Sequence, residues 1–271
     1  MRISGLGHAL FGVSVMGLSA LGLAYGDFKP LLEPFPALLP QPHAWAYGSA
    51  AILLVTGVGL LFGRTALVSV TIVAAFGLIW LITRARALFV GPLNIGSLYG
   101  VFEALGPLIG AWILYALLCR QYSSPAPGLP TGNGALRVAR ILFGISCIEY
   151  GAAHFAYAAY TASMVPAWLP APTGIAYLTG ALHAAAGLGL VFGICPRLAA
   201  TMEGTMMCLF GVLVWLPTFF SHHRPAWASP TEVQWSETAL TFLLASSALI
   251  VAASVQDDRR GLAPRERDGL G

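Results

Sequence analysis

Five polar side chains recur at the spacing of one helix face within an otherwise apolar stretch of the sequence. They follow one another at intervals of 3, 4, 3 and 4 residues: Cys147, Tyr150, His154, Tyr157 and Thr161. Residues three and four apart lie above one another on a helix, so these groups are predicted to form one polar stripe. We expect His154, with Tyr150 and Tyr157, to hydrogen-bond a ligand near the outer surface; packing against a neighbouring helix is the alternative.

Glu149 and His183 are the ionisable groups expected near the middle of the membrane. Glu149 projects about 100° away from Tyr150, beside the polar stripe. His183 lies near the centre of the next apolar stretch. With one helix rising and the next descending, Glu149 and His183 are predicted to lie at similar depth. A carboxyl and an imidazole that meet in a low dielectric can handle protons or anchor a ligand, so we assign both residues a catalytic role. The alternative is a structural pair that joins two helices.

The composition indicates the surroundings in which these side chains lie. The chain of 271 residues is 57% hydrophobic and 9% charged, with a mean hydropathy of +0.76, whereas soluble domains are about 25% charged. Eight apolar stretches are long enough to cross about 30 Å of hydrocarbon as helices. They cover residues 6–25, 47–63, 66–83, 97–118, 138–160, 173–193, 196–217 and 235–254. We therefore predict an all-α membrane protein with eight transmembrane helices.

The two halves of the chain repeat the same phrases in the same order. FPALLPQP (35–42) is followed by VPAWLPAP (165–172), LFGVS (10–14) by LFGIS (142–146), GVGLLFG (57–63) by GLGLVFG (187–193), and FGLIW (76–80) by FGVLVW (210–215). The offset stays between 130 and 135 residues. We predict two four-helix repeats, residues 1–118 and 138–255, joined by a cytoplasmic linker (119–137) and followed by a charged cytoplasmic tail (256–271). Four helices return the chain to its starting side, so the repeats should be parallel.

Glu103 and Glu237 occupy matching places in the last helix of each repeat. Because both are expected near a helix N-terminus, the helix dipole can stabilise their charge, and we predict a structural role for both. Arg84 and Arg86 are the expected partners of Glu103, and Arg224 is the expected partner of Glu237.

The site residues differ between the repeats. Glu149, His154 and His183 align with Gly17, Gly22 and Leu53 in the first repeat, so any chemistry should lie in the second bundle.

No metal site is predicted. The four cysteines form no C-x-x-C pair. Glu203 lies among Met202, Met206 and Met207; this cluster is a weak signal for a soft metal, and packing is the preferred role of its methionines. The chain has no basic stripe of the kind that binds nucleic acid.

Several of these phrases resemble one known family. The paired LFG[VI]S starts, AHFAYAAYTASMVPAWLP (153–170), the GLGLVFG ending and the glutamate of each fourth helix look like the DoxX-like bacterial membrane proteins, here as two fused copies. That family takes its name from a subunit of thiosulfate:quinone oxidoreductase. The resemblance thus implies a quinone-linked redox role and a place in the bacterial inner membrane. Related tandem proteins are expected to carry a histidine where this chain has Trp215.

Three functions follow as hypotheses. The first is a redox component or accessory subunit, such as a part of a quinone-linked oxidoreductase, that binds a quinone or similar hydrophobic molecule in the second bundle and meets a soluble redox partner. The second is a small-molecule transporter or exporter that uses the interface between the repeats. The third is a scaffold that docks soluble partners.

Lysine and arginine are distributed unevenly between the predicted loops. With the N-terminus inside, ten face the cytoplasm and four face outward, and cytoplasmic loops carry the excess of these residues. Reporter fusions at Arg2 and after Arg267 should therefore both report a cytoplasmic location. An external signal from either fusion would contradict the orientation or the count of eight helices.

Overall fold

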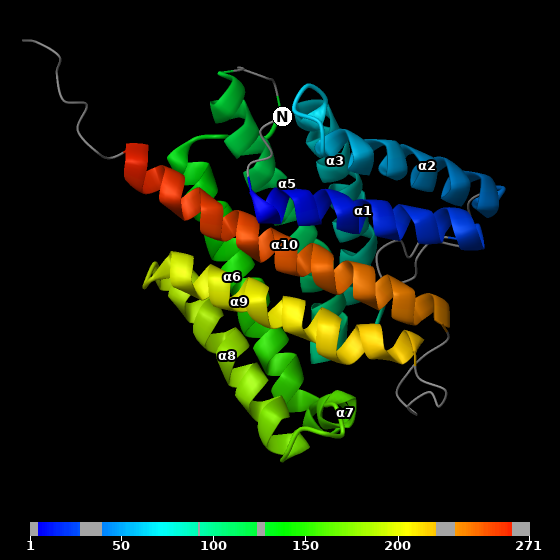
Figure 1. The fold of residues 1–271 in the computed structure, drawn as a ribbon, viewed down its shortest axis with the longest axis vertical. Coiled ribbons are helices and arrows are strands. Elements are labelled where there is room, and N and C mark those ends of the chain that lie inside the picture. Colours follow the sequence, from blue (N-terminus) through cyan, green and yellow to red (C-terminus); the bar gives the residue numbers. More distant parts are fainter. Residues whose placement is uncertain (1–4, 28–39, 92, 124–127, 221–230, 262–271) are drawn as a thin grey trace, which may run out of the picture.

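The computed structural model describes residues 5–27, 40–91, 93–123, 128–220 and 231–261, and within these ranges every regular element is helical (Figure 1). The elements in chain order are α1 (Leu6–Tyr25), α2 (Pro42–Leu60), α3 (Ala66–Ala85), α4 (Ala87–Val90), α5 (Ile95–Tyr122), α6 (Asn133–Ala156), α7 (Ala158–Met164), α8 (Pro172–Phe192), α9 (Pro196–Phe210), the π-helix η1 (Gly211–Trp215), the 3-10 helix η2 (Leu216–Phe219) and α10 (Thr231–Gly261).

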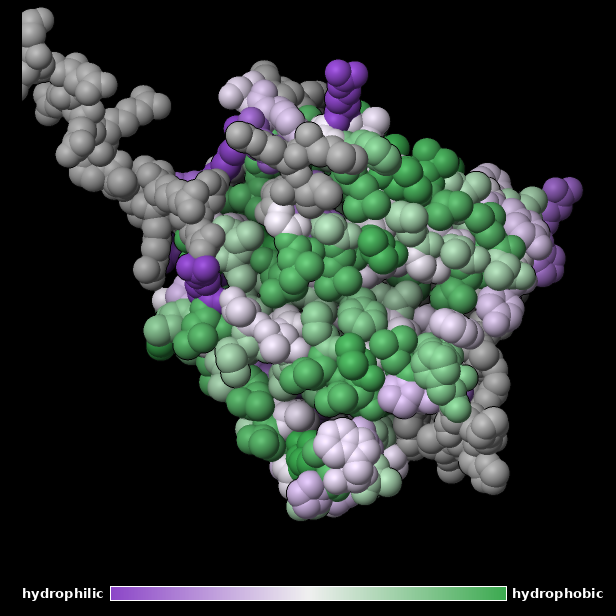
Figure 2. Space-filling model, in the orientation of Figure 1, coloured by the Kyte–Doolittle hydropathy of each residue, from purple (hydrophilic) through white to green (hydrophobic). Residues whose placement is uncertain are grey.

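Seven spans of the described chain are long and apolar enough to cross a membrane, and the bent pair α6 and α7 makes a possible eighth. The predicted all-α membrane protein is confirmed. Large apolar side chains, among them Val55, Val68 and Ile82, lie exposed on the outside of the spans. Figure 2 shows hydrophobic residues spread over the middle of one face, with strongly hydrophilic residues near its margins. Such a surface is suited to lipid, because acyl chains offer no hydrogen bonds.

Two of the predicted helices are not continuous. The stretch predicted at 138–160 breaks at Tyr157, where α7 turns away from α6 by 92°. Thr161 therefore lies beyond the bend, and the polar stripe ends before it. The stretch predicted at 196–217 is α-helical only to Phe210 and continues as the wider η1 and the tighter η2.

The four long helices of each half have corresponding neighbours. In the first half, α1 packs on α2 and α3 packs on α5; in the second, α6 packs on α8 and α9 packs on α10. The halves meet through α5 and α10, which contact each other, while α1 lies on α10 and α6 lies on α5 (Figure 1). The helices α1, α2, α3 and α5 thus correspond to α6, α8, α9 and α10, and corresponding pairs of helices are in contact in both halves.

Glycines bring the first two long helices of each half into backbone contact. A Cβ added to Gly57 on α2 would lie 3.2 Å from the carbonyl oxygen of Gly12 on α1. A Cβ added to Gly187 on α8 would lie 2.5 Å from the carbonyl oxygen of Gly144 on α6. Neither position has room for a side chain, so these glycines set the distance between the helices.

The repeated proline phrases end at helix starts. Pro42 and Pro172 open α2 and α8, where the missing N–H of proline is not needed. The residue before each, Gln41 or Ala171, adopts the left-handed conformation, with φ of 53° and 50°. Phe35 and Pro36 of the first phrase lie outside the described residues.

The contact between α6 and α8 gives a test of this packing. Gly187→Ala should lower the free energy of unfolding by about 1–3 kcal/mol, because the new methyl group would meet the backbone of α6. Gly48→Ala on α2 is the control, since an added Cβ there meets nothing within 4 Å. Thermal unfolding in detergent measures both; equal stability of the two variants would show that α6 and α8 separate easily.

Candidate functional site

A buried histidine and glutamate form the centre of the second bundle. His183 on α8 and Glu203 on α9 are each 1% exposed, and Nδ1 of His183 lies 2.9 Å from Oε1 and 3.1 Å from Oε2 of Glu203. An ionised carboxylate only accepts hydrogen bonds, so the imidazole donates through Nδ1. In the neutral ring this leaves Nε2 as an acceptor. The thiol of Cys147 on α6 is also next to the Glu203 carboxylate.

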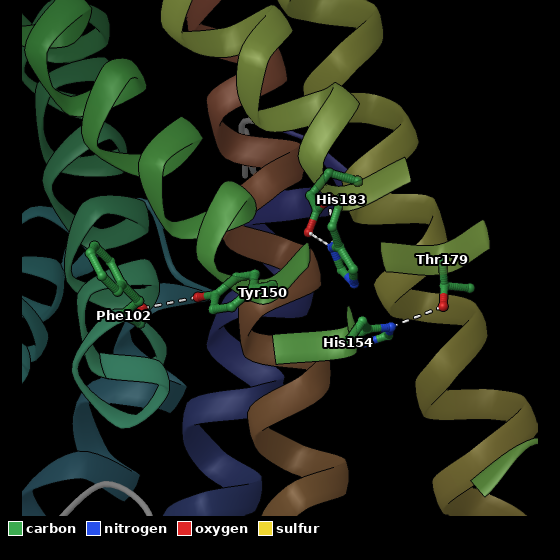
Figure 3. A network of polar contacts seen from close by, with 6 residues as sticks. Phe102, Tyr150, His154, Thr179 and His183 are labelled. Carbon is green, nitrogen blue, oxygen red and sulfur yellow. Dashed lines mark hydrogen bonds and ion pairs between the residues drawn. The ribbon is translucent and has the colours of Figure 1, made fainter. Parts of the chain in front are cut away.

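Aromatic rings surround His183. The ring of His154 meets it edge-on at a centroid distance of 4.9 Å, and Tyr150 approaches it at 5.9 Å. Phe210, the last residue of α9, stacks on His154 at 6.0 Å. The Nδ1 atom of His154 lies 2.9 Å from the hydroxyl oxygen of Thr179 on α8. Figure 3 shows both imidazoles between Tyr150 and Thr179. The arrangement brings two imidazoles and the Glu203 carboxylate together, with the aromatic rings of Tyr150 and Phe210 around them.

The two tyrosines of the predicted stripe make hydrogen bonds to α5. The hydroxyl of Tyr150 donates to the carbonyl of Phe102 at 2.9 Å (Figure 3). The hydroxyl of Tyr157, at the bend after α6, accepts from the backbone N–H of Gly96 at 3.1 Å. Both bonds tie the second bundle to the first. The Tyr157 hydroxyl keeps its own proton for a further partner, whereas Tyr150 has already donated its proton.

Glu149 and His183, predicted to approach each other directly or through one water, make no direct hydrogen bond. His183 bonds to Glu203, and neither carboxylate oxygen of Glu149 has a hydrogen-bond partner among the described residues, although Glu149 is only 8% exposed. The reason is the direction of the side chain. Gly151 faces α8, and Glu149 lies two positions earlier, about 200° around the helix from it. Glu149 instead lies within electrostatic range of Glu103 on α5, and the two carboxyl groups repel each other when both are ionised.

Glu203 is a site residue that was not predicted from the sequence, where it was noted only as a neighbour of methionines with a packing role. A readable signal was present, since His183 and Glu203 each lie ten residues from Gly193 in the tight turn between α8 and α9. In an antiparallel pair of helices, residues equally far from the turn lie at the same depth. Because the helix breaks at Tyr157, counting residues from a turn cannot give the relative depth of residues on α6 and α8.

The repeated glutamates lie within electrostatic range of the same arginine. Arg84 of α3 interacts electrostatically with both Glu103 and Glu237. Arg224, the partner predicted for Glu237, lies outside the described residues; Arg86, the other partner predicted for Glu103, is exposed. The predicted helix-dipole explanation is wrong for Glu103, because α5 begins at Ile95 and the dipole acts within about the first turn.

In the described part of the chain, no three His, Cys, Asp or Glu side chains are placed to hold a metal ion. The methionines near Glu203 in the sequence lie in different surroundings: Met202 is exposed and Met207 is buried.

The comparisons with known proteins bear on this bundle. Residues 135–216 match the family model DoxX. The matched region runs from α6 through η1 and contains the His183–Glu203 pair, His154 and Glu149. No curated protein and no solved structure matches the chain. The chain is thus a multi-pass membrane protein with a DoxX-like segment in its second half.

Removing the carboxylate tests the buried pair. Glu203→Ala leaves Nδ1–H of His183 buried without its acceptor, which should lower the free energy of unfolding by about 1–3 kcal/mol. Glu203→Gln keeps an acceptor oxygen and should lose less. The matched control is Thr205→Ala, an exposed position on the same helix. If Glu203→Ala and Thr205→Ala melt at the same temperature in detergent, the pair does not stabilise the bundle.

Proposed function

We propose that the protein is a DoxX-like membrane component whose second bundle binds a quinone or a similar hydrophobic ligand with carbonyl oxygens, and that it serves as a redox-linked component or accessory subunit. The observation that carries the proposal is the His183–Glu203 pair, buried within the spanning helices and in ring contact with His154. The DoxX match over the same residues supports it, because the resemblance implies quinone chemistry.

The site has groups suited to the protons of quinone chemistry. Reduction of a quinone to a quinol takes two electrons and two protons, one proton for each carbonyl oxygen. An imidazolium at His183, held by the Glu203 carboxylate, can donate one proton, and His154 can donate the other or hydrogen-bond the second oxygen. The electrons must come from a separate redox partner, which we expect to be a soluble protein.

The ligand is expected to approach past His154. His154, Thr179 and Phe210 are half-buried, whereas His183 and Glu203 are almost fully enclosed. A quinone ring entering from this side would meet the imidazole of His154 first and an aromatic surface at Phe210. The Tyr157 hydroxyl, near the same end of α6, is a further hydrogen-bonding group for the ligand.

Glu149 is proposed to handle protons separately from His183. Its carboxylate is buried and, among the residues described, makes no hydrogen bond. Because it has no fixed hydrogen-bond partner, such a carboxyl can exchange its proton with a water molecule or a ligand that enters the bundle. Glu103 of α5 is within electrostatic range of Glu149, and Arg84 is within electrostatic range of both Glu103 and Glu237.

We also propose that the chain is a tandem of two DoxX-like four-helix units. Three features support this proposal. Corresponding helices have corresponding neighbours in both halves. Both halves also have a close glycine contact, Gly12–Gly57 and Gly144–Gly187, and a left-handed residue before the proline that starts a helix, Pro42 or Pro172. On this proposal the first unit has a structural role, because Gly22 and Leu53 stand where the second unit has His154 and His183.

A quinone-binding experiment tests the proposed function. Decylubiquinone added to the detergent-solubilised protein should bind, and His154→Phe should weaken binding by about tenfold, because the ring remains but its hydrogen bond is lost. His43→Phe is the control, since His43 bonds to Gly26 in the first half. Glu149→Gln should fold normally and retain less quinone. Failure of the wild-type protein to bind, or equal binding by all variants, would exclude a quinone site here.

A transporter is the second candidate, favoured by Glu103 and Glu237 on the two helices where the halves meet, α5 and α10, and by Arg84 of the neighbouring α3. It requires solute flux in proteoliposomes that depends on these residues. A stoichiometric soluble partner with neither quinone nor flux would instead favour the scaffold.

A further inference from the structure

A cavity of about 220 Å³ lies between α1, α5, α9 and α10, apart from the His183 site. Its walls are mostly apolar, with Leu114 and Leu117 from α5 and Leu249 and Ile250 from α10. Arg197 and Thr201 of α9 complete it, together with the start of α1 at residues 5–8. The cavity therefore combines mostly apolar walls with one arginine at its edge and the buried imidazole of His8.

The packing of α10 explains why space remains there. An added Cβ at Gly7 of α1 would lie 2.9 Å from Cβ of Leu249, and one at Gly204 of α9 would lie 3.0 Å from the carbonyl oxygen of Ala245. These contacts hold α1 and α9 closely against α10. Between them α10 presents the small side chains of Ala252 and Ala253, which leave the space unfilled.

The polar edge of the cavity lies at the end of a membrane span. Arg197 is the second residue of the span Pro196–Phe219 and is exposed. Residues at this place in a span lie near the lipid headgroups. A guanidinium has five N–H donors, so Arg197 can keep a protein partner and still bind a phosphate oxygen. Thr201 follows one turn deeper, on the same side of α9.

We propose that this cavity binds an anionic phospholipid, with its phosphate at Arg197 and one acyl chain against Leu117, Leu249 and Ile250. Basic pockets between transmembrane helices select anionic headgroups by charge, while the apolar interior accepts the chain. A free phosphate would use only the first contact and a neutral lipid only the second. The lipid would bridge α1 of the first half and α9 and α10 of the second, and the site is independent of the quinone proposal.

Native mass spectrometry of the full-length protein in detergent tests the site. Phosphatidylglycerol should bind more tightly than phosphatidylcholine, with one site of highest affinity. Arg197→Gln should weaken that site about tenfold by removing a charge-assisted bond. Arg64→Gln is the matched control, because Arg64 is an exposed arginine in the turn between α2 and α3 and does not line the cavity.

A second variant tests the apolar interior. Ala253→Phe keeps Arg197 but fills the cavity, so it should displace the bound lipid about as strongly as Arg197→Gln does. Thermal unfolding without added lipid checks that both variants fold, and inorganic phosphate is added as a competitor. Equal binding of the two lipids, undiminished binding by Ala253→Phe, or full competition by inorganic phosphate would each overturn the proposal.

Discussion

The close contact of α6 with α8 is the constraint on which the candidate site depends. Besides Gly144 and Gly187, the helices touch at Gly151 and Gly180: an added Cβ at Gly180 would lie 2.9 Å from Cβ of His154. His154 thereby packs directly against the backbone of α8, one turn from His183. With larger residues at these positions the helices would separate, and the two imidazoles would lose the 4.9 Å contact between their rings.

Short and long polar side chains in the bundle satisfy their hydrogen bonds in different ways. The buried hydroxyls of Ser19, Thr56, Ser246 and Ser247 donate to carbonyls of their own helices three or four residues earlier. Such bonds satisfy the hydroxyl without a second helix, so these residues do not determine which helices pack against each other. A buried imidazole or carboxylate has no partner of this kind within its own helix. A partner for such a group comes from another helix, as Glu203 does for His183, and this pair therefore fixes the depth of α8 against α9.

These differences explain which parts of the structure were predictable from the sequence. The spans follow from apolar length alone, and α1 begins and ends at the predicted residues. The partners of the ionisable residues depend on helix rotation and on the register between helices. For His183 and Glu203 the short turn at Gly193 sets the register, so that pair was within reach of sequence reasoning. For Glu149 no such signal exists, because the bend at Tyr157 and residues 165–171 separate α6 from α8. The shared role of Arg84 depends on the meeting of α5 with α10, which no local pattern encodes.

The π-helix at Gly211–Trp215 has a counterpart in the sequence alignment of the two halves. FGLIW at 76–80 faces FGVLVW at 210–215, so the second stretch has one residue more. A π turn holds one more residue than an α turn, and the wide turn lies where the extra residue occurs. Single-residue insertions into a helix that cannot lengthen are absorbed in this way. Within an unbroken α-helix, one added residue would rotate all later residues by about 100° around the helix axis; the wide turn takes up that rotation, so Trp215 follows Phe210 after one extra residue, as Trp80 follows Phe76 without it. The extra residue is thus accommodated directly after Phe210, which remains stacked on His154.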